Sequence, residues 1–188
     1  MPTEQRRLSR HLIVDVALEI ADDDGLDAVT LATIASVAGC KAPSLYNHVN
    51  GLDDLLDELC LRATDDFSNA LRDSVVAKVG RDAVRSYAQA WRTYVLRRPG
   101  RYRATLRPLP HRRADHGSAS AGMTIPAGSI LSTLGIPDDR LDDAGRALRS
   151  TLHGFSVLEL TNTIGPTPDR SFESVVDTII SGLESLAN

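Results

Sequence analysis

The stretch that decides the fold is Thr30–Leu59, TLATIASVAGCKAPSLYNHVNGLDDLLDEL. Thr30 is suited to cap a helix, because its hydroxyl can accept a free backbone N–H, and apolar residues follow it at helical spacing. Gly39 then ends this helix, since glycine takes the left-handed conformation of a tight turn. Pro43 suits the first turn of a second helix, and Leu52 starts a longer third one.

Two short helices around a glycine turn predict a helix-turn-helix, which places its second helix in the major groove of DNA. The Asn50-Gly51 pair separates this motif from the longer helix. The chain between Leu31 and Gly51 contains no acidic residue. Such a surface can approach phosphates without carboxylate repulsion.

The charge of the chain argues weakly against this reading. The 188 residues carry a net charge of −4. Residues 1–60 contain four basic and eleven acidic residues, whereas DNA-binding domains are usually basic. The acids, however, cluster at 22–27 and 53–58, away from the second short helix. We therefore expect modest, strongly salt-dependent DNA affinity that relies on a dimer.

Several other classes of protein are disfavoured. No apolar run approaches the roughly 20 residues that cross a bilayer, and the N-terminus lacks the apolar core of a signal peptide, so we expect a cytoplasmic protein. We predict that Cys40 and Cys60 are buried thiols and that they form no disulfide framework. His153 and Glu159 lack metal-ligand spacing. We find no nucleophile–base constellation, glycine-rich phosphate loop or HExxH, and expect neither an enzyme nor a cofactor.

The rest of the chain favours helices throughout. Amphipathic spacing and breakers predict them at 8–24, 52–76, 83–96, 102–106, 121–134, 141–163 and 171–187. The predicted fold class is all-α. It comprises a three-helix helix-turn-helix domain over 1–52 and a larger helical domain for ligand binding and dimerisation over 53–188.

A basic stretch, Arg92–Arg113, contains eight arginines and no acid. Three interpretations stay open for it: a second DNA-contact surface, a solvated face, or a gate for an anionic ligand.

The N-terminal residues resemble the DNA-binding domain of the tetracycline-repressor (TetR) family of bacterial transcriptional regulators, over about 13–67. The matching motifs are Gly25–Thr30, Ile34-Ala35, Ala38-Gly39, Ser44–Val49 and Leu52–Leu56. Two further motifs, Arg98–Tyr102 and the His-Gly segment Leu152–Phe155, resemble C-terminal domains of one branch of that family. The resemblance implies a homodimer of about nine helices per chain, joined through its last two long helices, with a small-molecule pocket in the C-terminal domain.

The resemblance also implies a recognition helix at Ala42–His48. The DNA-binding residues would be Arg6, Arg7, Arg10, Thr30, Thr33, Lys41, Ala42, Ser44, Tyr46, Asn47 and His48. Tyr46 and His48 would bond phosphates, with packing between helices as the alternative, while Asn47 suits adenine and Lys41 guanine. The three arginines form either a phosphate-contacting arm or a solvated terminus.

This sequence departs from the family at positions that often carry cations. Leu52, Ala32 and Thr33 stand there instead, so phosphate anchoring should be thinner than usual.

Candidates for the ligand site are residues that also suit a plain core: Tyr87, Trp91, Tyr94, Tyr102, Met123, His153 and Phe155. Candidates for the dimer interface are Leu148, Leu152, Val176, Ile179 and Leu183. The predicted function is a ligand-responsive regulator, a repressor that binds a palindromic operator in double-stranded DNA as a homodimer and is released by a small-molecule effector. The alternative is a helical regulatory module that acts through protein partners.

Overall fold

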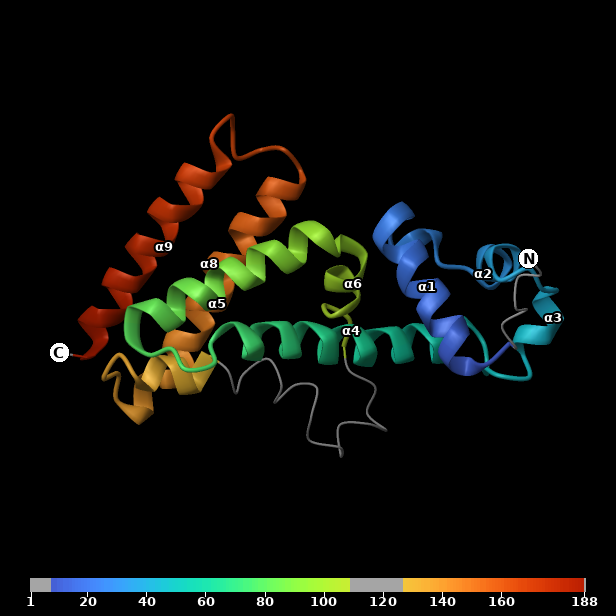
Figure 1. The fold of residues 1–188 in the computed structure, drawn as a ribbon, viewed down its shortest axis with the longest axis horizontal. Helices are drawn as coiled ribbons and strands as arrows, with labels where there is room; N and C mark the ends of the chain where they lie inside the picture. Colours follow the sequence, from blue (N-terminus) through green and yellow to red (C-terminus); the bar gives the residue numbers. More distant parts are fainter. Residues whose placement is uncertain (1–7, 109–126, 188) are drawn as a thin grey trace. The chain divides into compact units, whose positions relative to one another are not determined.

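The computed structural model describes residues 8–108 and 127–187, and within them it contains helices and no strand, which confirms the all-α prediction (Figure 1). Residues 127–132 are also helical. The longer elements are α1 (Arg10–Asp24), α2 (Leu31–Val37), α3 (Ala42–Leu45), α4 (Leu52–Ser74), α5 (Gly80–Arg97), α6 (Pro99–Ala104), α8 (Leu141–Leu160) and α9 (Pro168–Glu184). No helix of the described residues is long and apolar enough to span a membrane.

Contacts divide the chain into two units. The first comprises Met1–Ala63 and Arg98–Arg112, and the second Thr64–Arg97 and Arg113–Asn188. This division differs from the expected boundary after residue 52. The early turns of α4 belong with the N-terminal helices because Leu55 and Leu59 are fully buried in their core.

Side-chain caps begin the first two helices, and the one at Thr30 is the cap that the sequence predicts. Ser9 accepts the backbone N–H of Leu12 at 3.2 Å at the start of α1. Thr30 accepts the N–H of Thr33 at 3.0 Å at the start of α2. Each cap satisfies a donor that has no partner within its own helix.

In the first unit, α6 packs against the end of α1. A Cβ added at Gly100 would lie 1.8 Å from the carbonyl oxygen of Ala21, so only glycine permits this approach. Asp22 accepts both the backbone N–H and the Nε–H of Arg101 at 2.9 Å. The side chain of one helix therefore caps the other.

Arginines of the basic stretch neutralise acids of the first unit. Arg98 and Arg101 pair with Asp22, and Arg103 pairs with Asp27 at 3.0 Å. With these arginines included, the described residues of the first unit, 8–63 and 98–108, hold seven basic and ten acidic residues. The first unit is thus much less acidic than residues 1–60 alone indicate.

The second unit packs α5, α8 and α9 against one another (Figure 1). Residues of α8 and α9 at helical spacing form its core: Ala144, Leu148, Leu152, Phe155, Phe172, Val176, Ile180 and Leu183. Phe67 adds an aromatic cluster, with its ring 4.9 Å from that of Trp91 and 4.8 Å from that of Tyr94.

An ion-pair network joins these three helices, and its Arg92–Glu159 pair is nearly buried. Arg92 on α5 donates to Glu159 on α8 through Nε at 2.7 Å and Nη2 at 2.5 Å, and to Asp169 on α9 at 2.7 Å. Its guanidinium lies 4.9 Å from the centroid of the Phe172 ring. The hydrogen bonds to Glu159 raise the pKa of Arg92 far above its ordinary value. Arg92 therefore has a structural role, which is none of the three interpretations of the basic stretch.

We predict that Gly100→Ala lowers the free energy of unfolding by about 1–3 kcal/mol, because the new methyl group collides with the backbone of α1. The matched control is Gly145→Ala, in α8, where the added Cβ would make an ordinary 3.9 Å contact with Leu131. It should be neutral or stabilising, since alanine favours helix by about 0.5–1 kcal/mol. Urea denaturation followed by far-UV circular dichroism measures both. Equal effects of the two substitutions would contradict the close approach.

We predict that Arg92→Met costs about 3–5 kcal/mol of unfolding free energy, because it leaves Glu159 buried without its cation. Adding Glu159→Leu should recover most of that loss. Asp169→Asn is the control and should cost no more than about 1 kcal/mol, since the Asp169 side chain is 87% exposed. Thermal and urea denaturation of the three variants checks this. Additive losses in the double variant would refute a coupled buried pair.

Candidate DNA-binding and ligand sites

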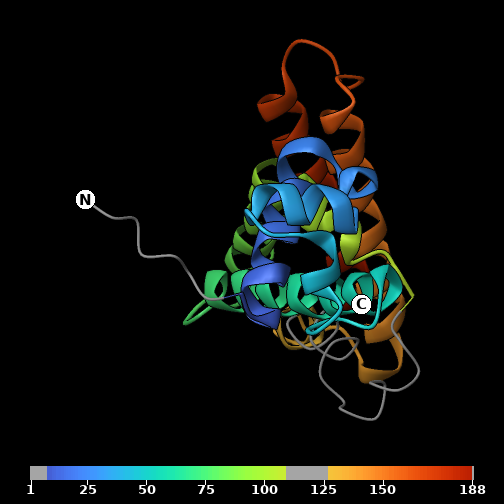
Figure 2. The ribbon, with the colours of Figure 1, turned by 90° about the vertical axis from the view of Figure 1, so that its right-hand side faces the viewer.

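The helix-turn-helix consists of α2, the turn at Gly39-Cys40 and α3, and Figure 2 views the first unit with these helices in front. Ile34, Leu45 and Val49 are buried and hold the two helices on α1 and α4. The turn closes with a bond from the N–H of Cys40 to the carbonyl of Ala35 at 2.9 Å. The backbone geometry of the motif is thus fixed by its own core.

The second helix of the motif is shorter than predicted. It covers Ala42–Leu45 rather than Ala42–His48, and Tyr46, Asn47 and His48 form turns. The reason lies in the carbonyl of Leu45, which accepts the N–H of both His48 at 2.9 Å and Val49 at 3.0 Å. Such a shared acceptor tightens the last turn and ends a helix.

The predicted DNA-contacting side chains differ in accessibility. Lys41, Tyr46 and Asn47 are exposed, and Tyr46 at 62% is one of the most exposed large apolar residues. This exposure excludes the alternative in which Tyr46 packs between helices. Five others are only partly accessible: Thr30, Thr33, Ala42, Ser44 and His48. The hydroxyls of Thr30 and Thr33 bond each other at 2.8 Å.

The N-terminal arginines do not act alike. Arg6 and Arg7 lie outside the described residues. Arg10 does not project as a free cation, because its guanidinium donates to Asp54, Glu58 and the carbonyl of His48. This geometry does not support the predicted phosphate contact by Arg10.

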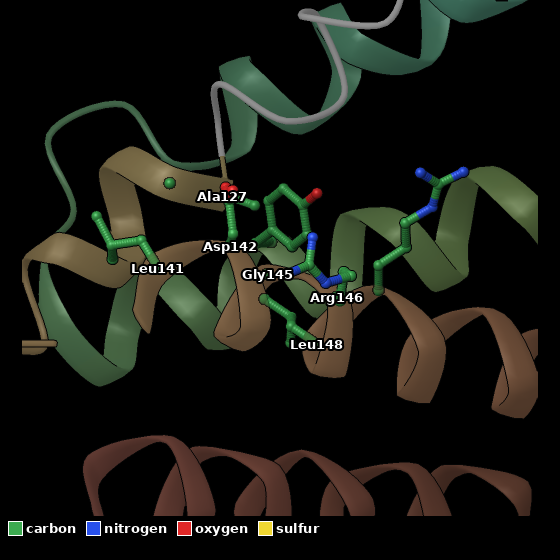
Figure 3. Close-up of a pocket in the computed structure, with 9 residues that line it drawn as sticks. Ala127, Leu141, Asp142, Gly145, Arg146 and Leu148 are labelled. Atoms are coloured by element: carbon green, nitrogen blue, oxygen red, sulfur yellow. The ribbon is translucent and has the colours of Figure 1, made fainter. Parts of the chain in front are cut away.

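A cavity of about 250 Å³ lies in the second unit, between α5, the helical residues from Ala127, and α8 (Figure 3). Its lining is Tyr87, Ala127, Gly128, Leu141, Asp142, Gly145, Arg146, Leu148 and Arg149. The side chains of α8 reach it at helical spacing, and Gly145 keeps it open. Arg146 pairs with Asp143 at 2.6 Å, and this bond raises the pKa of Arg146.

Of the residues predicted to contact a ligand, Tyr87 lines this cavity, and the other described ones are not among its lining residues. Trp91 and Tyr94 belong to the aromatic cluster with Phe67, and the ring of Phe155 lies 5.2 Å from that of Phe172. Tyr102 is buried in the first unit. His153 is half-buried on α8, and Met123 lies outside the described residues.

The contribution of α8 to the cavity was not predicted from the sequence. The available signal was the spacing of Leu141, Gly145, Leu148 and Arg149, which puts one glycine in an otherwise bulky face. The predicted ligand-site residues are mostly aromatic, and this face of α8 contains none.

The predicted dimer residues divide between two faces. Leu148, Leu152, Val176 and Leu183 are at most 3% exposed in the single chain, so they have almost no surface to offer a partner. Ile179 is only half-buried. It lines a shallow groove between α8 and α9, with Thr151, Ser174, Val175 and Thr178.

The two thiols are unevenly buried. Cys60 is 1% exposed, with its Sγ 3.7 Å from the carbonyl oxygen of Arg107, whereas Cys40 is half-buried in the motif's turn. Within residues 8–108 and 127–187, no group of His, Cys, Asp and Glu is arranged to hold a metal ion.

Comparison with known proteins shows what the chain is similar to. Residues 13–59 match the family described as bacterial regulatory proteins, tetR family, and residues 84–179 match the tetracyclin repressor-like C-terminal domain. An uncharacterized HTH-type transcriptional regulator of Mycobacterium tuberculosis, Rv0681, is 35% identical, over 95% of this chain and 83% of its own. The uncharacterized HTH-type regulator YobS of Bacillus subtilis is 33% identical, over 94% and 93%.

A solved structure has the same fold. The Streptomyces coelicolor TetR family protein ActR, in complex with (S)-DNPA, superposes with a TM-score of 0.67 at 21% identity, over 96% of this chain and 99% of its own. These matches extend over nearly the whole chain. They agree with the helix-turn-helix of the first unit and with the helical second unit. The chain belongs to the TetR family of bacterial transcriptional regulators.

Proposed function

We propose that this regulator is a repressor that binds a palindromic operator as a homodimer. The observation that carries the proposal is the surface of α2 and α3, which exposes Lys41, Tyr46 and Asn47 and contains no acidic residue. In a dimer, two such surfaces would enter successive major grooves, about 34–36 Å apart. Asn47 would read adenine and Lys41 guanine, while Tyr46 would set the register on phosphate.

The cavity beside Tyr87 is the proposed effector site. Its volume of about 250 Å³ suits a small molecule, and its apolar walls carry a few charged groups, as ligand sites do. ActR, a structural relative, is solved with a small molecule bound. An effector that favours one dimer geometry with about 1–3 kcal/mol of coupling would change operator affinity roughly 5- to 150-fold.

Two chain connections can transmit that coupling within the described residues. Helix α4 is continuous across the boundary after Ala63, and α5 leads directly into α6 at Arg97-Arg98. Since α6 is locked to α1 through Asp22, a shift at the end of α5 would reach the helix on which the motif packs.

The proposed dimer interface is the outer face of α8 and α9. Leu158 is 50% exposed there, and the groove at Ile179 is lined mainly by apolar atoms. Pairing this face with its copy would form a four-helix arrangement around a two-fold axis.

The operator proposal predicts that DNA flanking the protein's own gene contains a palindromic site, protected in footprinting at low salt. Affinity should fall steeply as salt rises, because phosphate contacts release counterions. If no palindrome is protected and DNA affinity does not change with salt, the result would favour the alternative, a helical module that acts through protein partners.

Two substitutions separate base reading from phosphate anchoring. Asn47→Ala should cost about 1–3 kcal/mol on the operator and relax selectivity at one base pair, because it removes a base-edge contact. Tyr46→Phe should weaken operator and scrambled duplexes alike, since a lost phosphate bond carries no sequence information. Titrations of both duplexes by fluorescence anisotropy measure this. Unchanged binding by both variants would show that the recognition surface lies elsewhere.

The interface proposal predicts that Ile179→Arg yields a folded monomer, because it places a charge inside an apolar contact. Val79→Arg is the matched control, since Val79 is 69% exposed in the loop after α4, outside the proposed interface. It should leave the dimer intact. Light scattering gives the mass and circular dichroism the helicity. A dimeric Ile179→Arg protein would place the interface on another face.

A further inference from the structure

Arg10 is the first residue of α1, where an arginine is unusual. A cation in the first turn opposes the helix dipole, so α1 itself gains nothing from it. The guanidinium turns instead toward the end of the helix-turn-helix. Its Nη1 donates to the carbonyl oxygen of His48 at 3.0 Å and to Asp54 Oδ2 at 2.9 Å. Its Nη2 donates to Asp54 Oδ1 at 3.3 Å and to Glu58 Oε2 at 3.1 Å.

Asp54 extends this contact to the turn between the motif and α4. Its Oδ2 also accepts the backbone N–H of Asn50 at 3.1 Å. Arg10 and Asp54 together therefore hold both ends of the segment His48–Asn50. This segment directly follows Tyr46 and Asn47, whose backbone is in turns rather than in a helix.

Beyond Leu45, a single tight turn holds Tyr46 and Asn47, because the carbonyl of Leu45 accepts the N–H of both His48 and Val49. Arg10 anchors the far side of this turn, at the carbonyl of His48. The planar guanidinium can bond several acceptors in one rigid geometry, which an ammonium group cannot reproduce. The hydrogen bond to Asp54 raises the pKa of Arg10, so its guanidinium stays charged. The three groups are about a quarter to a third exposed, so they lie at the edge of the motif.

We propose that Arg10 is a positioning residue for DNA recognition: it clamps the His48–Asn50 turn to α4 through Asp54 and thereby aims Asn47 at the base edges of the major groove. The inference rests on the proposed operator binding, and it assigns Arg10 to protein structure rather than to phosphate. Specificity would then depend on an arginine and an aspartate that do not touch DNA.

The test uses the full-length dimer and a duplex selected in vitro for binding to the wild type, with a scrambled duplex beside it. Arg10→Lys keeps the positive charge but cannot bridge the three acceptors. We expect operator affinity to fall roughly 5- to 150-fold, the cost of losing one base contact, with scrambled-duplex affinity and salt slope unchanged. A phosphate contact by Arg10 would tolerate lysine and, in Arg10→Gln, lose about one released counterion from the slope.

For Asp54→Asn, simple electrostatics and loss of the clamp predict opposite changes in operator affinity. Removing a negative charge should strengthen DNA binding if only electrostatics matters, whereas loss of the clamp should weaken operator binding. The matched control is Asp53→Asn, which removes the same charge one residue away at an exposed position. It should bind the operator as well as the wild type or better. Circular dichroism and retained scrambled-duplex binding confirm that each variant is folded.

Operator binding by Arg10→Lys and Asp54→Asn equal to that of the wild type would overturn the positioning role and leave the proposed function standing. Absence of any selected duplex for the wild type would instead defeat the proposed function itself.

Discussion

The side chain of Asp22, which is only 6% exposed, ties α1 to α6: it accepts the backbone N–H and the Nε–H of Arg101 and pairs with Arg98. The helix-turn-helix depends on this attachment, because α1 carries much of the core on which α2 and α3 pack. The same kind of pairing recurs at Asp27 with Arg103 and at Asp15 with Arg62. Asp15, Asp22 and Asp27 are thus paired with arginines of the same unit. The motif can face DNA although the N-terminal sequence is acidic.

The elements were predictable from sequence where their determinants are local. Caps such as Thr30, breakers such as Gly39 and the apolar spacing of α8 and α9 all act within a few residues. The role of Arg10 was not predictable, since its partners Asp54 and Glu58 are 44 and 48 residues away. The role of Arg92 was also not predictable from the basic stretch in which it lies, because its partner Glu159 is on another helix, 67 residues later.

The functional faces of the second unit were harder to predict for a related reason. Hydrophobic periodicity identifies the most apolar face of a helix. In α8 and α9 that face is buried in the core of the single chain. A partner or a ligand must use the weaker stripes, where Gly145 and Ile179 lie among polar neighbours. A glycine that leaves space, or a half-buried isoleucine, gives little signal in a pattern of hydrophobicity. Burial in the folded chain distinguishes these faces, and sequence spacing alone does not.

The central claim is that the acid-free surface of α2 and α3 is where this regulator meets DNA. Hydrogen–deuterium exchange of the full-length protein, with and without a specifically bound duplex, tests it directly. DNA binding at this surface predicts slower exchange in peptides covering residues 30–50, with unchanged exchange in the acidic segment 53–58, in the first two turns of α4. Protection confined to the second unit, or equal protection across the chain with specific and scrambled duplexes, would contradict it.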